Sequence, residues 1–129
     1  TPEGLKVCKD LSTDDVAVNV TLCFSTAQAI LAAKAGATYV SPFVGRVNDQ
    51  SFDGIKLIEE ISDVYATHKQ KTQVLAASIR DVHQVASCFR VGADICTIPS
   101  KIFSGMYKHI LTDQGIAKFD EDWTKLVGG

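Results

Sequence analysis

The chain has 129 residues and a net charge of −2, and 46% of its residues are hydrophobic and 22% charged. This length allows one domain, and the composition is ordinary for a soluble globular protein. The charge argues against a nucleic-acid-binding protein, because such proteins concentrate Lys and Arg, and no apolar run approaches the roughly 20 residues that span a bilayer.

Helix and strand signals alternate along the chain, beginning with a helix. Residues 2–11 have mostly helical apolar spacing, and a proline stands at the expected start. Residues 16–24 alternate strictly between two faces, which predicts a strand. One face carries the larger apolar side chains, and the other carries Asn19, Thr21 and Cys23. Small and polar residues on that second face fit the inside of an α/β barrel near its mouth.

The next segments repeat this order. Ser25 is placed to cap a helix that stops at Gly36. Residues 38–44 predict a strand that runs into a loop containing Arg46, and a helix over residues 53–69 follows.

The second half of the chain continues the alternation. Because parallel neighbours need crossover connections, alternating strands and helices predict a parallel sheet. Four strands cannot close a barrel whose standard form has eight, so residues 1–129 are expected to be one unit that forms half of such a barrel. The remaining predicted elements are a strand over 73–79, a helix over 81–92 capped by Asp81, a strand over 93–99, and helices over 100–111 and 115–126 separated by a break at "TDQG".

The four cysteines are expected to be reduced, structural thiols. None forms a Cys-x-x-Cys pair, and no His stands at metal-ligand spacing from any of them. Cys23 and Cys96 lie in strand-like runs, where a free thiol behaves as a small hydrophobic group. Reduced thiols indicate a cytoplasmic protein.

The acidic run "DEDW" at residues 120–123 is interpreted as a solvated helix face with Trp123 packed beneath it. A hard-cation site needs oxygens that converge from a shaped loop, and the sequence offers none. Neither a metal nor a cofactor is therefore expected.

Two arginines follow successive predicted strands. In α/β proteins ligands bind beyond the carboxyl ends of strands, and Arg46 and Arg80 each stand between such an end and a helix start. The guanidinium fork matches phosphate oxygens, and helix amino ends offer N–H donors. With the hydroxyl of Ser78, these groups predict a phosphate site. The alternative is that each arginine only pairs with a nearby carboxylate, such as Asp49, Asp53 or Asp81.

Asn19 and Thr21 are expected to point the same way along their strand. They can hold a water or a substrate hydroxyl, or they can form a hydrogen-bonded pair that only satisfies buried polar groups. Their spacing does not choose between the two roles.

Four stretches of the sequence stand out together, namely "VNVTLCFSTAQAILAAKAGATYVSPFVGR", "VLAASIR", "GADICTIP" and "LTDQGIAKFDEDW". They resemble the transaldolase family, and the resemblance covers essentially the whole chain. The resemblance implies a (β/α)8 TIM barrel, of which these residues would be the carboxyl-terminal half, strands five to eight. It also implies class I aldolase chemistry, in which a strand lysine forms a Schiff base with a ketose phosphate and a dihydroxyacetone unit passes to an aldehyde acceptor such as erythrose 4-phosphate.

Carried over onto this sequence, the resemblance makes Arg46, Ser78 and Arg80 the phosphate-binding groups. Ser41 corresponds to a serine that contacts the substrate. Phe43 corresponds to the aromatic side chain beside the reacting centre.

Two further residues correspond to groups at the family's reacting centre. Asn19 matches the asparagine near the Schiff-base nitrogen and the substrate hydroxyls, and Thr21 matches the threonine that positions the catalytic water. The fructose-6-phosphate aldolase branch is similar in fold but has Tyr in place of Phe43 and lacks the asparagine. The resemblance therefore favours transaldolase itself.

The family's lysine is expected outside these residues. It lies in a motif resembling Lys-Ile-Pro-x-Thr, followed by a Glu-Gly helix start, and Thr1 would be the last residue of that motif. The family's acid/base Asp, and its Glu or Gln, would precede it. The chain is therefore expected to be inactive alone and to act with an amino-terminal half. The alternatives are a non-catalytic sugar-phosphate-binding or structural half-barrel, and fructose-6-phosphate aldolase activity.

The chain is also expected to associate. Four parallel strands leave two open edges, which favour pairing with the amino-terminal half or with a second copy. The family's small members form large rings, so the resemblance implies a homo-oligomer in which Phe119 and Trp123 of the last helix cross onto a neighbour.

Overall fold

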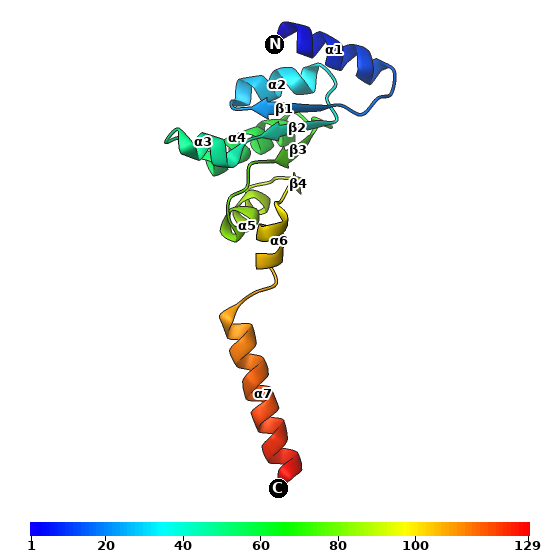
Figure 1. Ribbon diagram of the computed structural model, residues 1–129. Coiled ribbons are helices and arrows are strands. Elements are labelled where there is room, and N and C mark those ends of the chain that lie inside the picture. Colours follow the sequence, from blue (N-terminus) through cyan, green and yellow to red (C-terminus); the bar gives the residue numbers. More distant parts are fainter.

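The computed structural model describes all of residues 1–129 as an α/β body followed by one separate helix (Figure 1). The strands form one parallel sheet in the order β1-β2-β3-β4, so each strand pairs only with its neighbours in sequence. The predicted alternation of parallel strands and helices is confirmed. The elements are α1 (Pro2–Thr13), β1 (Asn19–Cys23), α2 (Thr26–Lys34), β2 (Tyr39–Pro42), α3 (Val44–Asp49), α4 (Gly54–Thr67), β3 (Gln73–Ala76), α5 (Val82–Arg90), β4 (Ile95–Cys96), α6 (Ser100–Gly105) and α7 (Ile110–Gly128).

Side-chain caps start the helices where the sequence predicts them. Ser25 Oγ accepts from the N–H of Gln28, and Asp81 Oδ1 accepts from the N–H of Gln84. Each glutamine side chain reaches back to accept from the backbone N–H just before the cap. This reciprocal bonding satisfies donors that a helix start leaves unpaired. The end of α2 is also confirmed, since Gly36 follows it with a φ of 88° that glycine adopts without steric cost.

The core lies between one face of the sheet and the helices α2, α4 and α5. Val40 of β2 and Val74 of β3 are buried against Ile58 and Ile61 of α4. Burying an aliphatic side chain of this kind stabilises a fold by roughly 1.5–3 kcal/mol. The body is therefore held together by its own sheet-on-helix packing.

The opposite face of the sheet is open. Strand residues alternate between faces, and the residues that alternate with the core positions include Asn19, Thr21, Gln73 and Thr97, all exposed. In addition, β1 and β4 each pair on one side only. The sheet thus has one packed face, one open face and two open edges.

β1 departs from the strict alternation that the sequence predicts. Its pairing with β2 places one extra residue between Val20 and Cys23, which is a β-bulge. Leu22, within the bulge, has a φ of 55° and is half exposed, whereas Cys23 is buried. The prediction that Cys23 shares a face with Asn19 and Thr21 is wrong, because an inserted residue moves every later side chain to the other face.

The last helices differ from their predicted bounds. α7 begins at Ile110 and runs unbroken through the predicted break at residues 112–115. His109 caps it, since His109 Nδ1 accepts from the N–H of Leu111 at 3.2 Å. A glycine inside a helix costs only about 1 kcal/mol relative to alanine, so Gly115 does not end the helix.

α7 stands clear of the body (Figure 1). None of its residues is buried, and Trp123 is 65% exposed. The predicted packing of Trp123 beneath an acidic face is therefore wrong within the single chain, because no other element lies under this helix. No helix of the chain combines the length and the apolar character that crossing a bilayer requires.

Candidate functional site

The residues predicted to form the site fall into an inner group and a rim group. The inner group is Asn19 at the start of β1, Thr21 within β1, and Ser41 in β2. Ser41 is buried, and its Oγ donates to Asn19 Oδ1 at 2.9 Å. This bond uses an acceptor of Asn19, so the amide nitrogen is the group left to donate to a ligand. Thr21 is exposed on the same strand.

The rim group lies beyond the carboxyl ends of β2 and β3. Phe43 follows β2, and Arg46 lies in α3 rather than in the loop that the sequence predicts. This short helix forms because its two valines are buried against the core. Ser78 and Arg80 follow β3, and Ser78 has a φ of 58°. A non-glycine residue in this conformation is uncommon and is worth noting where it occurs beside a candidate site.

Arg46 is free of carboxylate partners. Its guanidinium carbon lies 5.1 Å from the centroid of the Phe43 ring, which in turn packs against Phe24 with centroids 5.7 Å apart. At an exposed site a cation over an aromatic face gains about 0.5–1 kcal/mol. The aromatic contact therefore holds the side chain while leaving its N–H donors available to an anion.

Arg80 instead has a carboxylate partner. Its Nη2 donates to Asp49 Oδ2 at 2.7 Å, and both side chains are half exposed. Of the two alternatives that the sequence leaves open, pairing with an Asp is the one observed for this arginine. An ion pair this exposed contributes at most about 1 kcal/mol, so an incoming anion can compete with it.

At the helix amino ends near the arginines, aspartate side chains already accept from some of the backbone N–H groups. Asp81 Oδ1 accepts from a backbone N–H at the start of α5, and Asp53 Oδ1 does the same at the start of α4. The N–H donors that the sequence offers to a phosphate are thus partly satisfied by the protein's own carboxylates. The guanidiniums remain the main groups on the rim for an anion.

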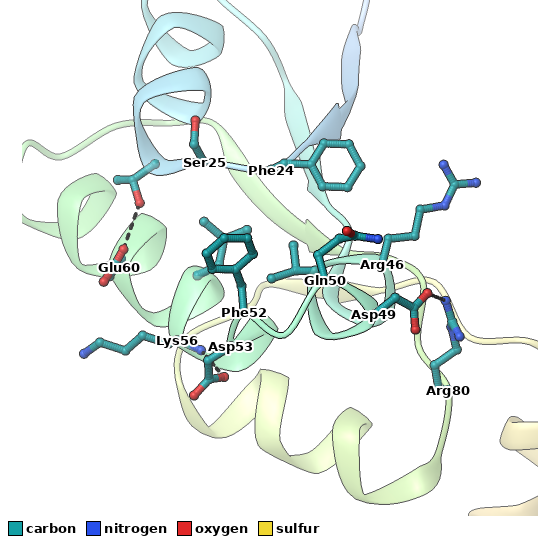
Figure 2. A pocket seen from close by; sticks show the side chains of 13 residues that line it. Phe24, Ser25, Arg46, Asp49, Gln50, Phe52, Asp53, Lys56, Glu60 and Arg80 are labelled. Atoms are coloured by element: carbon teal, nitrogen blue, oxygen red, sulfur yellow. Dashed lines mark hydrogen bonds and ion pairs between the residues drawn. The ribbon is translucent and has the colours of Figure 1, made fainter.

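A groove of about 830 Å³ runs along the rim (Figure 2). Arg46 and Arg80 line it, but no residue of the inner group does. Sequence reasoning missed the rest of its lining, which includes Phe24, Gln50, Phe52, Lys56 and Glu60. The sequence gives a signal only for the two phenylalanines, because each follows the end of a strand or a helix. In the structure both are exposed.

The lysines do not form an amine site. Every lysine is exposed, and none lies in a strand. Lys56 lines the groove, but its Nζ donates to Glu59 at 3.3 Å, and this hydrogen bond raises the pKa of Lys56. A Schiff-base nucleophile instead needs an amine whose pKa is lowered.

The cysteines are free thiols, as expected. Burial raises the pKa of Cys8 and Cys23 above the usual value. A hydrogen bond that the Cys88 thiol donates to Cys96, together with burial, raises the pKa of Cys88, and the same bond lowers that of Cys96. The buried thiols therefore stay protonated and act as small packing groups. No three His, Cys, Asp or Glu side chains are grouped so that they could hold a metal ion.

Comparison with known proteins extends over the whole chain. Residues 1–129 match the family model described as transaldolase/fructose-6-phosphate aldolase. A protein of Paracoccus denitrificans named "Probable transaldolase" is 52% identical over 123 residues, which cover 95% of this chain and 57% of that protein. A protein of the same name from Brachyspira hyodysenteriae is 52% identical over 128 residues, covering 99% of this chain and 59% of the relative. The chain thus spans less than two thirds of these relatives.

Solved structures share the fold at low identity. A flavocytochrome b2 with benzoylformate matches with a TM-score of 0.59 and 18% identity, over 73% of this chain and 26% of the other. A mandelate oxidase matches with a TM-score of 0.56 and 20% identity, over 73% of this chain and 29% of the other. This likeness concerns the parallel α/β arrangement alone.

Proposed function

This chain belongs to the transaldolase and fructose-6-phosphate aldolase family, and on that premise we propose that it provides the phosphate site of a transaldolase. The reaction transfers a dihydroxyacetone unit between sugar phosphates through a Schiff base. Sedoheptulose 7-phosphate and glyceraldehyde 3-phosphate give erythrose 4-phosphate and fructose 6-phosphate, a step of the pentose phosphate pathway. The observation that carries the proposal is the pair of arginines on the rim of the sheet.

The rim has the charge and geometry for a phosphate monoester. Arg46 is held by an aromatic ring and has no carboxylate partner, and Arg80 has only the exposed Asp49. These three groups carry one net positive charge. Of the other charged side chains that line the groove, Lys56 offsets one carboxylate, and Asp53 and Glu60 already accept hydrogen bonds from the protein itself. Bidentate contact from a guanidinium is the usual way in which proteins recognise phosphate oxygens. Ser78, two residues before Arg80, would add a hydroxyl.

The inner group would handle the reacting carbons. Asn19, aligned by Ser41, offers an amide N–H to substrate hydroxyls near the Schiff base. Thr21 offers an exposed hydroxyl on the same open face, where it would hold the water used in proton transfer. Phe43 would lie between the inner group and the phosphate. The chemistry uses no cofactor.

The Schiff-base lysine would come from outside these residues. Every lysine here is exposed and none is in a strand, so no candidate is desolvated. The relatives are longer than this chain, and the sheet has four parallel strands with one open face and two open edges; we propose that these are strands five to eight of a (β/α)8 barrel. We therefore propose that catalysis requires an amino-terminal half and that the chain alone is inactive.

The proposed assembly is a homo-oligomer in the cytoplasm. α7 exposes large apolar side chains that no part of the body covers, which supports contact with a second copy. Its apolar residues at 116, 119, 123 and 126 follow the 3-4-3 spacing of a helix-packing seam. The four free thiols fit a reducing compartment.

Reconstitution tests the catalytic proposal. The chain is assayed for transaldolase turnover alone and after mixing with the amino-terminal half of a relative, with Arg46→Ala as the phosphate-site variant. We expect turnover only in the mixture, with a strongly raised KM for the sugar phosphate in the variant. Phosphate binding without turnover in the mixture would favour the second candidate, a non-catalytic sugar-phosphate-binding or structural half-barrel, which the exposed lysines support. Release of free dihydroxyacetone without an acceptor would indicate fructose-6-phosphate aldolase activity instead.

A further inference from the structure

The two segments that carry the rim arginines touch through their backbones. The N–H of Val44 donates to the carbonyl of Ala77 at 2.9 Å, and the N–H of Gly45 donates to the carbonyl of Ser78 at 2.9 Å. The first turn of α3 is therefore bonded directly to the chain that leaves β3. Arg46 follows this contact on one side, and Arg80 follows it on the other.

The contact leaves no room for a side chain at position 45. A Cβ there would lie 2.5 Å from Arg80 Nε and 2.8 Å from Arg80 Cγ, and closer still to the carbonyl oxygen of Ser78. Real Cβ atoms essentially never approach another heavy atom within 3.0 Å. Gly45 has no positive φ, so what position 45 requires is the absence of a Cβ and not an unusual conformation. Glycine in such a place marks a close approach of two backbones.

α3 holds Arg80 at a second point, one turn later. Residues 45 and 49 are four apart and so lie on the same side of the helix. Asp49 accepts from the guanidinium, while the stem of Arg80 lies over Gly45. In Figure 2 the Asp49–Arg80 pair lies on one side of α3, and the Arg46 side chain points away from it.

We propose that Gly45 is a positioning residue for anion binding, because it lets the stem of Arg80 lie across α3 and so fixes the placement of Arg80 relative to Arg46. The proposal rests on the proposed phosphate role of these two arginines. The ligand class is a phosphate monoester that receives one guanidinium from each segment. With a Cβ at position 45, the carbonyl of Ser78 and the stem of Arg80 would both have to move, so Arg80 would lose its placement relative to Arg46.

Phosphate titration of four forms of the 129-residue chain tests the proposal, with inorganic phosphate as the probe. The forms are the unmodified chain, Gly45→Ala, Gly92→Ala and Gly115→Ala. Gly92 is the matched control for destabilisation, because it has a φ of 107° and lies before β4, at the end of the sheet away from the rim. Gly115 has no atom within 4 Å of an added Cβ. We expect Gly45→Ala to bind phosphate roughly one to two orders of magnitude more weakly, as for the loss of a hydrogen bond to a charged group, and both controls to bind it normally.

A double-mutant cycle separates positioning from a general disturbance of the rim. If Gly45 acts through Arg80, then Gly45→Ala weakens binding no further in an Arg80→Ala background. Equal losses in both backgrounds would overturn the inference, as would normal binding by Gly45→Ala. Failure of the unmodified chain to bind phosphate would overturn the proposed function itself, and this inference with it.

Hydrogen exchange in the unmodified chain provides a test that does not depend on the folding of a variant. Phosphate bound to Arg80 should tighten the contact beneath it, so the amide of Gly45 should exchange several-fold more slowly when phosphate is added. Amides of α7 should not change. Equal exchange at Gly45 with and without bound phosphate would contradict the proposal even if Gly45→Ala does not fold.

Discussion

The α/β body and α7 use apolar side chains in opposite ways. In the body, Ile58 and Val74 are buried between helix and sheet. In α7, Phe119 and Trp123 are 74% and 65% exposed, and no residue of the helix is buried. In proteins, most helical stability comes from the packing of an apolar face. The comparison teaches that the body is stabilised by packing within the chain, whereas α7 finds no packing surface within it.

The largest effect should come from opening a cavity in the body. Ile58→Ala is expected to lower the free energy of unfolding by about 2–5 kcal/mol, because Ile58 is fully buried and the core can collapse only partly. The matched change Ile116→Ala in α7 should alter it by no more than about 0.5 kcal/mol. Urea unfolding followed by NMR signals of the body measures both, since fluorescence of the single Trp would report α7. Similar losses in the two variants would show that α7 packs on the body.

The second effect concerns association through α7. Trp123→Ala is expected to weaken self-association by about 2 kcal/mol or more, since a buried Trp is a common hot spot of interfaces. Sedimentation velocity of the chain across a concentration series measures the shift. Lys125→Ala is the control, because Lys125 forms only an exposed ion pair with Glu121 on the same helix. An unchanged distribution of species in Trp123→Ala would contradict the proposed role of α7.

Alkaline pH should lower the stability of the body through its thiols, and α7 contains no thiol. Burial raises the pKa of Cys8 and Cys23 above 9.0, so the folded body holds these protons more tightly than the unfolded chain does. Their stabilising contribution is complete below about pH 9 and is lost as the pH rises further, by up to about 1.4 kcal/mol per pH unit for each thiol. Burial raises the pKa of Tyr65 too, which acts in the same direction.

Denaturant midpoints measured between neutral and alkaline pH test this dependence. Replacing Cys23 with Ala should reduce the slope of stability against pH while lowering the stability at neutral pH. A midpoint independent of pH up to about 10, one unit above the usual thiol pKa, would contradict the buried state of these thiols.

The smallest effect should appear at the rim. Asp49→Asn keeps an acceptor for Arg80 but removes a negative charge beside the proposed phosphate site. We expect phosphate to bind about two- to fivefold more tightly at low salt, consistent with the modest energy of an exposed ion pair. Asp120→Asn removes the same charge from α7 and should leave phosphate affinity unchanged. Weaker binding by Asp49→Asn would mean that the carboxylate is needed to orient Arg80.

Much of the fold could be predicted from local sequence signals. Ser25 and Asp81 cap the helices that the sequence predicts, and Gly36 ends one of them. Such signals act over a few residues, so a single sequence contains them in full. The bulge at Leu22 could not be predicted, because it depends on how β1 pairs with β2. The continuity of α7 was missed because Gly115 and the polar residues before it have the composition of a turn.

The sequence selects residues for the candidate site, but their arrangement could not be predicted from it. The rule that ligands bind beyond strand ends selects Arg46 and Arg80, and both line the groove. The different environments of these arginines, one over an aromatic ring and one beside Asp49, depend on α3. α3 forms because two valines become buried in the folded chain, and burial of that kind is decided by residues far away in sequence.

The strand order has a consequence for how the chain folds during its synthesis. Each strand of β1-β2-β3-β4 pairs with the strand made just before it, so every new strand finds its neighbour already present. Contacts of this kind are comparatively local, and local contacts favour rapid folding. α7 is made after these strands, and none of its residues is buried. Its exposed apolar face therefore reaches solution only when the rest of the chain has had the opportunity to fold, which limits the time for premature aggregation.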